Sequence, residues 1–169
     1  MRGPISAELL GISSDLAITD PAILIKRLYT PESSHKEYEL GFMPHWANAH
    51  SGWADVCEAA GIKYISPLKK VECVLSDLGK TKLLLTEAMH GAIVADALRV
   101  PWIPLHTKFS DYNPQKWLDW CRTVNISYSP EPVTRLFNFD FADKLTITSP
   151  VQSSKIGRAS CRERVFRAV

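Results

Sequence analysis

Hydrophobic and polar positions follow two different periods along residues 4–150. Short apolar runs predict strands, and most of them are followed by a segment whose apolar residues recur every three or four positions, the period of a helix. Glycine or proline stands at most of the junctions, where either residue ends an element. The predicted strands cover residues 38–43, 63–66, 82–85 and 101–105, and the predicted helices cover 4–10, 22–28, 52–60, 69–78, 91–99 and a stretch that begins at Pro114.

The alternation of strands and helices predicts an α/β fold, a Rossmann-like parallel sheet with helices on both faces. The chain contains no internal repeat. Ligands of such sheets bind in the crevice beyond the carboxyl ends of the strands. The side chains predicted at that edge come from the segments that follow the four strands: His45 after the first, Ser66, Lys69 and Lys70 after the second, 86–91 after the third, and His106 and Lys108 after the fourth.

Length and composition are those of an ordinary globular protein. The chain has 169 residues, of which 46% are hydrophobic and 22% are charged, so it is not a disordered or collagen-like sequence. No apolar run reaches the roughly 18 residues that a membrane helix needs, and the first residues lack the apolar segment of a secretory signal. We therefore predict one folded domain, over residues 1–150, without a membrane span and located in the cytoplasm.

The net charge of +2 conceals an uneven distribution. Five basic residues and one acidic residue lie in 153–169, and the rest of the chain holds 15 basic and 17 acidic residues. The body therefore offers no basic surface for nucleic acid, and we expect no nucleic-acid partner. The run KIGRASCRERV resembles a translated adapter or vector sequence, so residues 151–169 are predicted to be a disordered, non-native tail. The alternative is a genuine basic arm.

The four cysteines are widely spaced and include no C-x-x-C pair. This spacing does not suit a zinc site or a dithiol redox site, so we predict reduced and mostly buried thiols. No other group of residues has metal-ligand spacing, and we expect no bound metal.

The loop that follows the third predicted strand carries the clearest chemical signal. His90 and Gly91 stand where an apolar helix begins, and the unpaired N–H groups of a helix start favour an anion. A glycine there would let the anion approach the backbone, and His90 would donate a hydrogen bond or a proton near neutral pH. The alternative is that His90 only caps or packs at the helix start.

Several motifs, taken in order, resemble the polysaccharide pyruvyl transferase family. They are RGPISAELLG at 2–11, TDPAIL at 19–24, GFMPHW at 41–46, EAMHGAIVADA at 87–97 and VPWIPL at 100–105. The resemblance spans about residues 1–135, and the run from Glu87 is its most specific part. It implies that the chain is one half of a two-domain architecture like that of GT-B glycosyltransferases, with the family's N-terminal domain absent before Met1.

The resemblance also implies a reaction. That family transfers pyruvate from phosphoenolpyruvate to two hydroxyls of a sugar, and the product is a cyclic ketal on an exopolysaccharide or cell-wall polymer. The partners would be this small-molecule donor and a saccharide acceptor, and no cofactor is expected. Protonation of the donor's methylene carbon and departure of its phosphate require a general acid and cations for two anionic groups.

The family's roles carry over to several residues of this chain. His90 is assigned as general acid or phosphate ligand, and Arg2 as a bidentate ligand for an anion of the donor. Many members carry an arginine where this chain has Ala88, so Lys69 or Lys70 would supply that charge, unless both are simply solvated. The full set predicted to bind substrate is Arg2, His45, Ser66, Lys69, Glu87, Met89 and Gly91.

Other candidates each have two interpretations. Asp20 is either a helix cap or an active-site acid, with the cap favoured. Trp117 and Trp120 stack on sugar rings or, as their helical spacing favours, belong to the core. Trp46 and Trp53, near His45, are better placed for an acceptor sugar. His35 and His50 have no evident partner in the sequence.

Two other functions remain open. One is a glycosyltransferase that uses a nucleotide sugar, because the same fold and helix start would bind a diphosphate. The other is a non-catalytic fragment that binds a small anion or nothing. Loss of a partner domain would expose apolar surface, so we also expect self-association.

Overall fold

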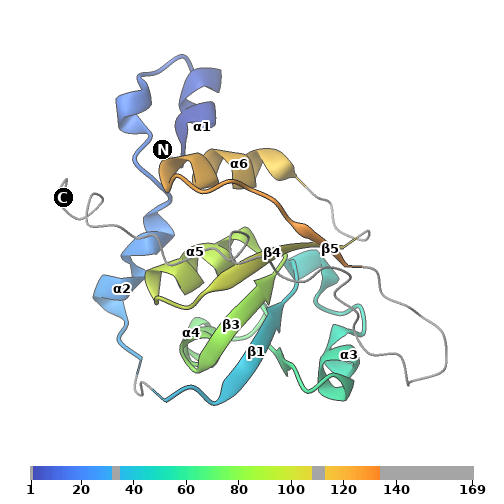
Figure 1. The fold of residues 1–169 in the computed structure, drawn as a ribbon. Coiled ribbons are helices and arrows are strands. Elements are labelled where there is room, and N and C mark those ends of the chain that lie inside the picture. The colour runs from blue at the N-terminus through green and yellow to red at the C-terminus, as the bar shows by residue number, and fades with distance from the viewer. Residues whose placement is uncertain (1, 32–34, 108–112, 134–169) are drawn as a thin grey trace.

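The computed structural model describes residues 2–31, 35–107 and 113–133 (Figure 1). Within them, five strands form one parallel sheet in the order β2-β1-β3-β4-β5. The predicted α/β fold with a parallel sheet is therefore confirmed. The strands are β1 (Tyr38–Met43), β2 (Lys63–Tyr64), β3 (Thr81–Thr86), β4 (Trp102–Thr107) and β5 (Glu131–Val133).

The register of the central strands brings three carboxyl ends together. Met43 at the end of β1 lies opposite Thr86 at the end of β3, and Thr86 lies opposite Pro104 of β4. The carboxyl ends of parallel strands lie at the same edge of the sheet, so the loops after β1, β3 and β4 begin side by side.

Helices cover both faces of the sheet, but unequally. On one face the core contains Ile93, Trp102 and Trp120, with contributions from η2 (Pro21–Leu24), α4 (Val71–Gly79), α5 (Met89–Ala97) and α6 (Pro114–Thr123). On the other face lies α3 (Trp53–Ala59) (Figure 1). Its Trp53 and Cys57 pack against Phe42, Leu85 and Ile103. Large side chains are buried in both cores, and the first core is the more extensive.

Several observed elements differ from the predicted ones. The strand predicted over 63–66 is only two residues long, and the helix predicted over 22–28 is the short helix η2 followed by α2 (Ile25–Leu28). The strand β5 was not predicted, because three residues that include Pro132 show no alternation. The predicted tail, 151–169, lies outside the described residues.

The N-terminal segment forms a projection beside α6. It contains α1 (Pro4–Leu9) and η1 (Ser14–Leu16), and α1 packs on α6 (Figure 1). Leu9, Leu10 and Leu16 on this projection are exposed. Self-association through this apolar surface stays a prediction that light scattering would test.

The expectation of buried thiols is confirmed at two positions. Cys57 and Cys121 are buried and free, and burial raises the pKa of each to about 12. Cys73 is exposed, and Cys161 lies outside the described residues. No helix in the described ranges has the length and apolar character needed to cross a membrane.

Candidate functional site

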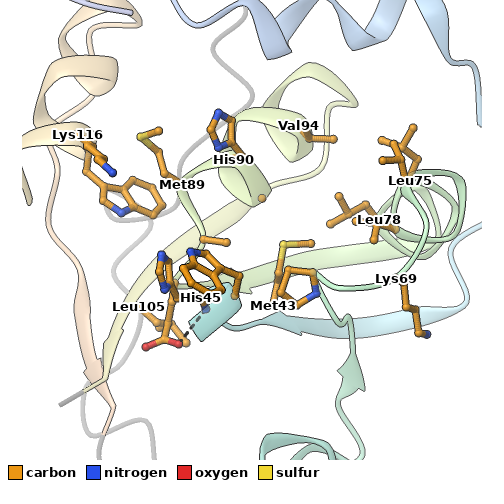
Figure 2. Close-up of a pocket in the computed structure, with 18 of the residues that line it drawn as sticks. Met43, His45, Lys69, Leu75, Leu78, Met89, His90, Val94, Leu105 and Lys116 are labelled. Atoms are coloured by element: carbon orange, nitrogen blue, oxygen red, sulfur yellow. Dashed lines mark hydrogen bonds between the residues drawn. The ribbon is translucent and has the colours of Figure 1, made fainter. Parts of the chain in front are cut away.

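A cavity of about 460 Å³ lies at the carboxyl edge of the sheet. Its size is within the range of small-molecule sites. The loops after β1 and β3 and the first turn of α5 form its floor, while α4 and α6 contribute opposite walls (Figure 2). Leu75, Leu78 and Val94 make one side apolar, and His45, His90 and Lys116 make the other side polar (Figure 2).

The structure brings most of the predicted site residues to this cavity. The residues that line it are Arg2, His45, Lys69, Glu87, Met89, His90 and Gly91. Ser66 is not among the lining residues. Its hydroxyl accepts a hydrogen bond of 3.3 Å from the Leu68 N–H group and so supports the turn that follows β2.

Arg2 and His90 meet at one carboxylate, that of Asp20. Arg2 Nε donates a hydrogen bond of 2.8 Å to Asp20 Oδ2, and His90 Nε2 lies 3.5 Å from the same oxygen. The Asp20 side chain is only 4% exposed, whereas that of His90 is 61% exposed. An ion pair partly shielded from water thus stands beside an accessible imidazole.

Asp20 also caps η2, so the two interpretations of this residue are not exclusive. Its Oδ1 accepts a hydrogen bond of 3.0 Å from the Ala22 N–H group. Burial alone would raise the pKa of the Asp20 carboxyl. The hydrogen bond from Ala22 and the positive charges of Arg2 and His90 outweigh burial and leave the pKa below its ordinary value.

Arg2 is held in place by a contact between distant parts of the chain. Asp119 of α6 is buried, and its carboxylate accepts hydrogen bonds from the Ile5 and Ser6 N–H groups and from the Ser6 hydroxyl. Gly3 packs so closely on α6 that an added Cβ would lie 2.2 Å from the Asp119 carbonyl oxygen. These contacts dock the start of α1 and explain the glycine and serine that follow Arg2.

Glu87 joins the ends of three strands. Its Oε2 accepts hydrogen bonds from the His45 N–H group, at 3.1 Å, and from Asn48 Nδ2, at 3.2 Å. Its Oε1 accepts from the N–H group of Thr107, at 3.2 Å, and from the Thr107 hydroxyl. The side chain was predicted to bind substrate, but its oxygens are already used by four protein donors, which indicates a positioning role.

His45 and Trp46 follow β1 on the rim of the cavity. Their rings lie 5.7 Å apart, and the Trp46 side chain is 65% exposed. His45 Nδ1 is buried without a hydrogen-bond partner in the described part of the chain. A polar atom in that state lacks the compensation that a ligand or a water molecule would supply.

The structure gives a packing reason for Gly91. A Cβ at this position would lie 2.7 Å from Met43 Sδ and 2.8 Å from Thr86 Oγ1, so it would point at the sheet. The glycine therefore allows α5 to pack closely on β1 and β3, and the approach of an anion to its backbone stays a prediction. Met89, two residues before it, is 9% exposed and belongs to the core while also lining the cavity.

The lysines differ in their availability to a ligand. Lys69 Nζ lies 3.4 Å from Asp77 Oδ2, so its charge is shared with a carboxylate outside the cavity. Lys116, on the other side of the cavity, has no acidic partner among the described residues (Figure 2). Lys116 was not predicted, because nothing in the first turn of an amphipathic helix marks one lysine as facing a cavity.

Burial separates the tryptophans that belong to the cores from the one that is exposed at the cavity. Trp53 is 2% exposed and packs against Phe42 on the far face of the sheet, so the prediction that it contacts an acceptor sugar is wrong. Trp117 and Trp120 are buried in the larger core, as their spacing favoured. Among the described tryptophans, Trp46 alone is exposed.

Within residues 2–31, 35–107 and 113–133, no group of three or more histidine, cysteine or acidic side chains is arranged to hold a metal ion. Arg2, His90 and Lys116 are side chains of the kind that bind anions, and an imidazole is a group that can transfer a proton.

A curated relative, the Succinoglycan biosynthesis protein ExoV of Rhizobium meliloti (strain 1021), is 40% identical to this chain over 134 residues. The matched residues are 79% of the chain, and they span 42% of the relative's length. No protein-family model matches the chain, and no solved structure matches it significantly. The relative's name refers to succinoglycan biosynthesis.

Proposed function

We propose that this chain forms the donor-binding part of a polysaccharide pyruvyl transferase, which uses phosphoenolpyruvate to modify a saccharide in exopolysaccharide biosynthesis. The observation that carries the proposal is the cavity in which Arg2 and His90 share the Asp20 carboxylate. The order of the motifs and the relative in succinoglycan biosynthesis support it further.

The donor has two anionic groups, and the cavity offers cations for both. Arg2 uses Nε for Asp20, so its terminal amino groups remain for a phosphate or a carboxylate. The first turn of α5 has no side-chain cap, and its N–H groups favour an anion at the same place. Lys116 is the second cation in our proposal and takes the group that Arg2 does not bind.

His90 is the proposed proton donor. Its Nε2 faces Asp20, so Nδ1 remains for the substrate. In the proposed reaction this imidazolium protonates the methylene carbon of the donor, and a sugar hydroxyl adds to the adjacent carbon. The phosphate then leaves with the C–O bond electrons, and a second hydroxyl closes the ketal as both hydroxyl protons are released.

Trp46 is the proposed contact for the acceptor. An exposed indole on the rim of a cavity presents a flat apolar surface, onto which the C–H face of a sugar ring packs. The short helix η3 (Trp46–Asn48) that carries Trp46 is tied to the sheet through Asn48 and Glu87. The platform is thus held rigidly beside the donor cavity.

The test is isothermal titration of the purified 169-residue chain with phosphoenolpyruvate. We expect saturable binding, and we expect Arg2→Ala and His90→Ala each to weaken it about tenfold or more, since each removes a charged partner of an anion. The matched controls are Arg122→Ala and His50→Ala, which change exposed residues that do not line the cavity.

Competition identifies the donor class. Tighter binding of a nucleotide sugar than of phosphoenolpyruvate, lost in the same two variants, would replace the proposal with a glycosyltransferase. The absence of binding by either compound would contradict both enzymes for this chain. Equal loss of affinity in the control variants would show that the cavity is not the binding site.

A further inference from the structure

Asp20 connects two cationic side chains that come from different parts of the chain. Arg2 precedes α1, and His90 lies in the first turn of α5, yet both approach Asp20 Oδ2, at 2.8 and 3.5 Å. The other carboxylate oxygen is occupied by the cap on the Ala22 N–H group. One buried carboxylate therefore has a structural contact on one oxygen and two cavity side chains on the other.

We propose that Asp20 is a positioning residue, which holds Arg2 and His90 together as one preformed binding unit for an anion. The inference rests on the proposed function for the identity of that anion, and on geometry alone for the unit itself.

Charge and burial both fit this role. When His90 is protonated, a guanidinium and an imidazolium beside a single carboxylate leave one net positive charge, so the unit attracts an anion. The Asp20 side chain is 4% exposed and does not compete with the ligand for the opening of the cavity. Without it the two cations would repel each other, and Arg2 would lose the hydrogen bond that orients its plane.

The other charged groups around the cavity act elsewhere. Glu87 faces its own four donors, and Lys69 is paired with Asp77. Lys116 and His45 line the cavity from α6 and from the segment after β1, and neither belongs to the groups that act on the Asp20 carboxyl, which are Ala22, Arg2 and His90. Asp20 is thus the carboxylate that couples Arg2 to His90.

A cap alone would not need a carboxylate. Asparagine and serine also accept a hydrogen bond from the N–H group two residues later, so Asp20→Asn and Asp20→Ser keep the cap on η2. Neither side chain carries the charge that attracts both Arg2 and His90. The two variants therefore separate the structural role of Asp20 from the positioning role.

The first experiment is a double-mutant cycle on the binding of phosphoenolpyruvate to the full chain. We expect Asp20→Asn to weaken binding roughly tenfold in the wild-type background, but less than about twofold when Arg2→Ala is already present. Asp55→Asn, a change of an exposed aspartate on α3, is the matched control and should leave the affinity unchanged. The same fold-change in both backgrounds would overturn the proposal, because a general structural effect is additive.

The second experiment does not depend on the donor. In ¹⁵N-edited NMR spectra near neutral pH, the hydrogen bond to Asp20 should slow exchange of the Arg2 Nε–H proton and keep its signal visible. We expect Asp20→Asn and Asp20→Ser to remove this signal and Asp55→Asn to retain it. A signal that persists in both Asp20 variants would refute the positioning role, whereas failure of the wild-type chain to bind phosphoenolpyruvate would refute only the proposed function.

Discussion

Glu87 and Asp20 are both buried acidic residues beside the cavity, and they differ in the groups that bind them. Glu87 accepts hydrogen bonds from uncharged donors of two segments: His45 N–H and Asn48 Nδ2 after β1, and both donors of Thr107 in β4. Asp20 accepts one backbone hydrogen bond and directs its other oxygen at the charged side chains of Arg2 and His90.

The two sets of donors give the same functional group different roles. A carboxylate bound by uncharged donors satisfies backbone groups that would otherwise be buried unpaired, and so it stabilises the fold. A carboxylate bound by side-chain cations fixes the positions of those cations and has little effect on the backbone. Loss of Glu87 should therefore act on stability first, and loss of Asp20 on ligand binding first.

The largest expected effect is that of Glu87→Ala on stability. The variant leaves several buried donors without an acceptor, and we expect the free energy of unfolding to fall by roughly 3 kcal/mol or more. Urea denaturation of the chain, followed by tryptophan fluorescence, measures this quantity. Glu39→Ala is the control, because Glu39 pairs with Lys82 on the surface and its loss should cost less than about 1 kcal/mol. A similarly small loss of stability for Glu87→Ala would contradict the stabilising role that distinguishes Glu87 from Asp20.

Asp119→Ala should have an intermediate effect, on both stability and binding. Asp119 resembles Glu87 in its donors, the N–H groups of Ile5 and Ser6 and the Ser6 hydroxyl, but the segment that it docks carries Arg2. We expect a loss of roughly 1–3 kcal/mol in the free energy of unfolding and, at temperatures where the variant is folded, weaker binding of phosphoenolpyruvate. Hydrogen exchange should show faster exchange in residues 4–10. Unchanged affinity would mean that α1 docks without Asp119.

The smallest expected effect is the pH dependence that Asp20 adds to stability. Its pKa is lowered in the folded chain, because the contacts with Ala22, Arg2 and His90 outweigh burial. The stabilisation by these contacts is therefore complete above the pKa of the unfolded carboxyl, near pH 4, and is lost as the pH falls through the folded pKa. Arg2 is 34% exposed, so we expect roughly 1 kcal/mol or less.

Urea denaturation of the wild type and Asp20→Asn between pH 7 and pH 3 measures this term. The difference in free energy of unfolding should shrink below about pH 4, where the Asp20 carboxyl becomes protonated. Asp55→Asn corrects for the general effect of acid on the chain. A difference that does not change with pH would show that the charge of Asp20 is not what stabilises the fold.

Much of the fold could be predicted because its signals are local. The strand over residues 38–43 is observed with the same bounds, since an apolar run ended by Pro44 has one dominant interpretation. The parallel arrangement followed from helices between the strands. The strand β5 could not be predicted, because three residues acquire a strand conformation only through pairing with β4.

The position of the cavity could be predicted from the sequence, but the contacts of the individual side chains around it could not. The carboxyl edge of the sheet indicated where His45, Glu87 and His90 would gather. The sequence could not reveal that Glu87 is saturated by protein donors, that Gly91 faces Met43, or that Lys116 enters the cavity from α6. Each of these depends on side chains that meet across the fold.

The order of the elements and the edge at which polar side chains collect follow from the sequence, because helix and strand periods arise from local backbone geometry. The partners of each buried carboxylate follow only from the tertiary structure. The hydrogen bonds of Asp119 to Ile5 and Ser6 join residues more than 110 positions apart. The contact of Arg2 with Asp20 joins residues 18 positions apart. Local propensity carries no information about such pairs, since they form only when packing brings the two segments together.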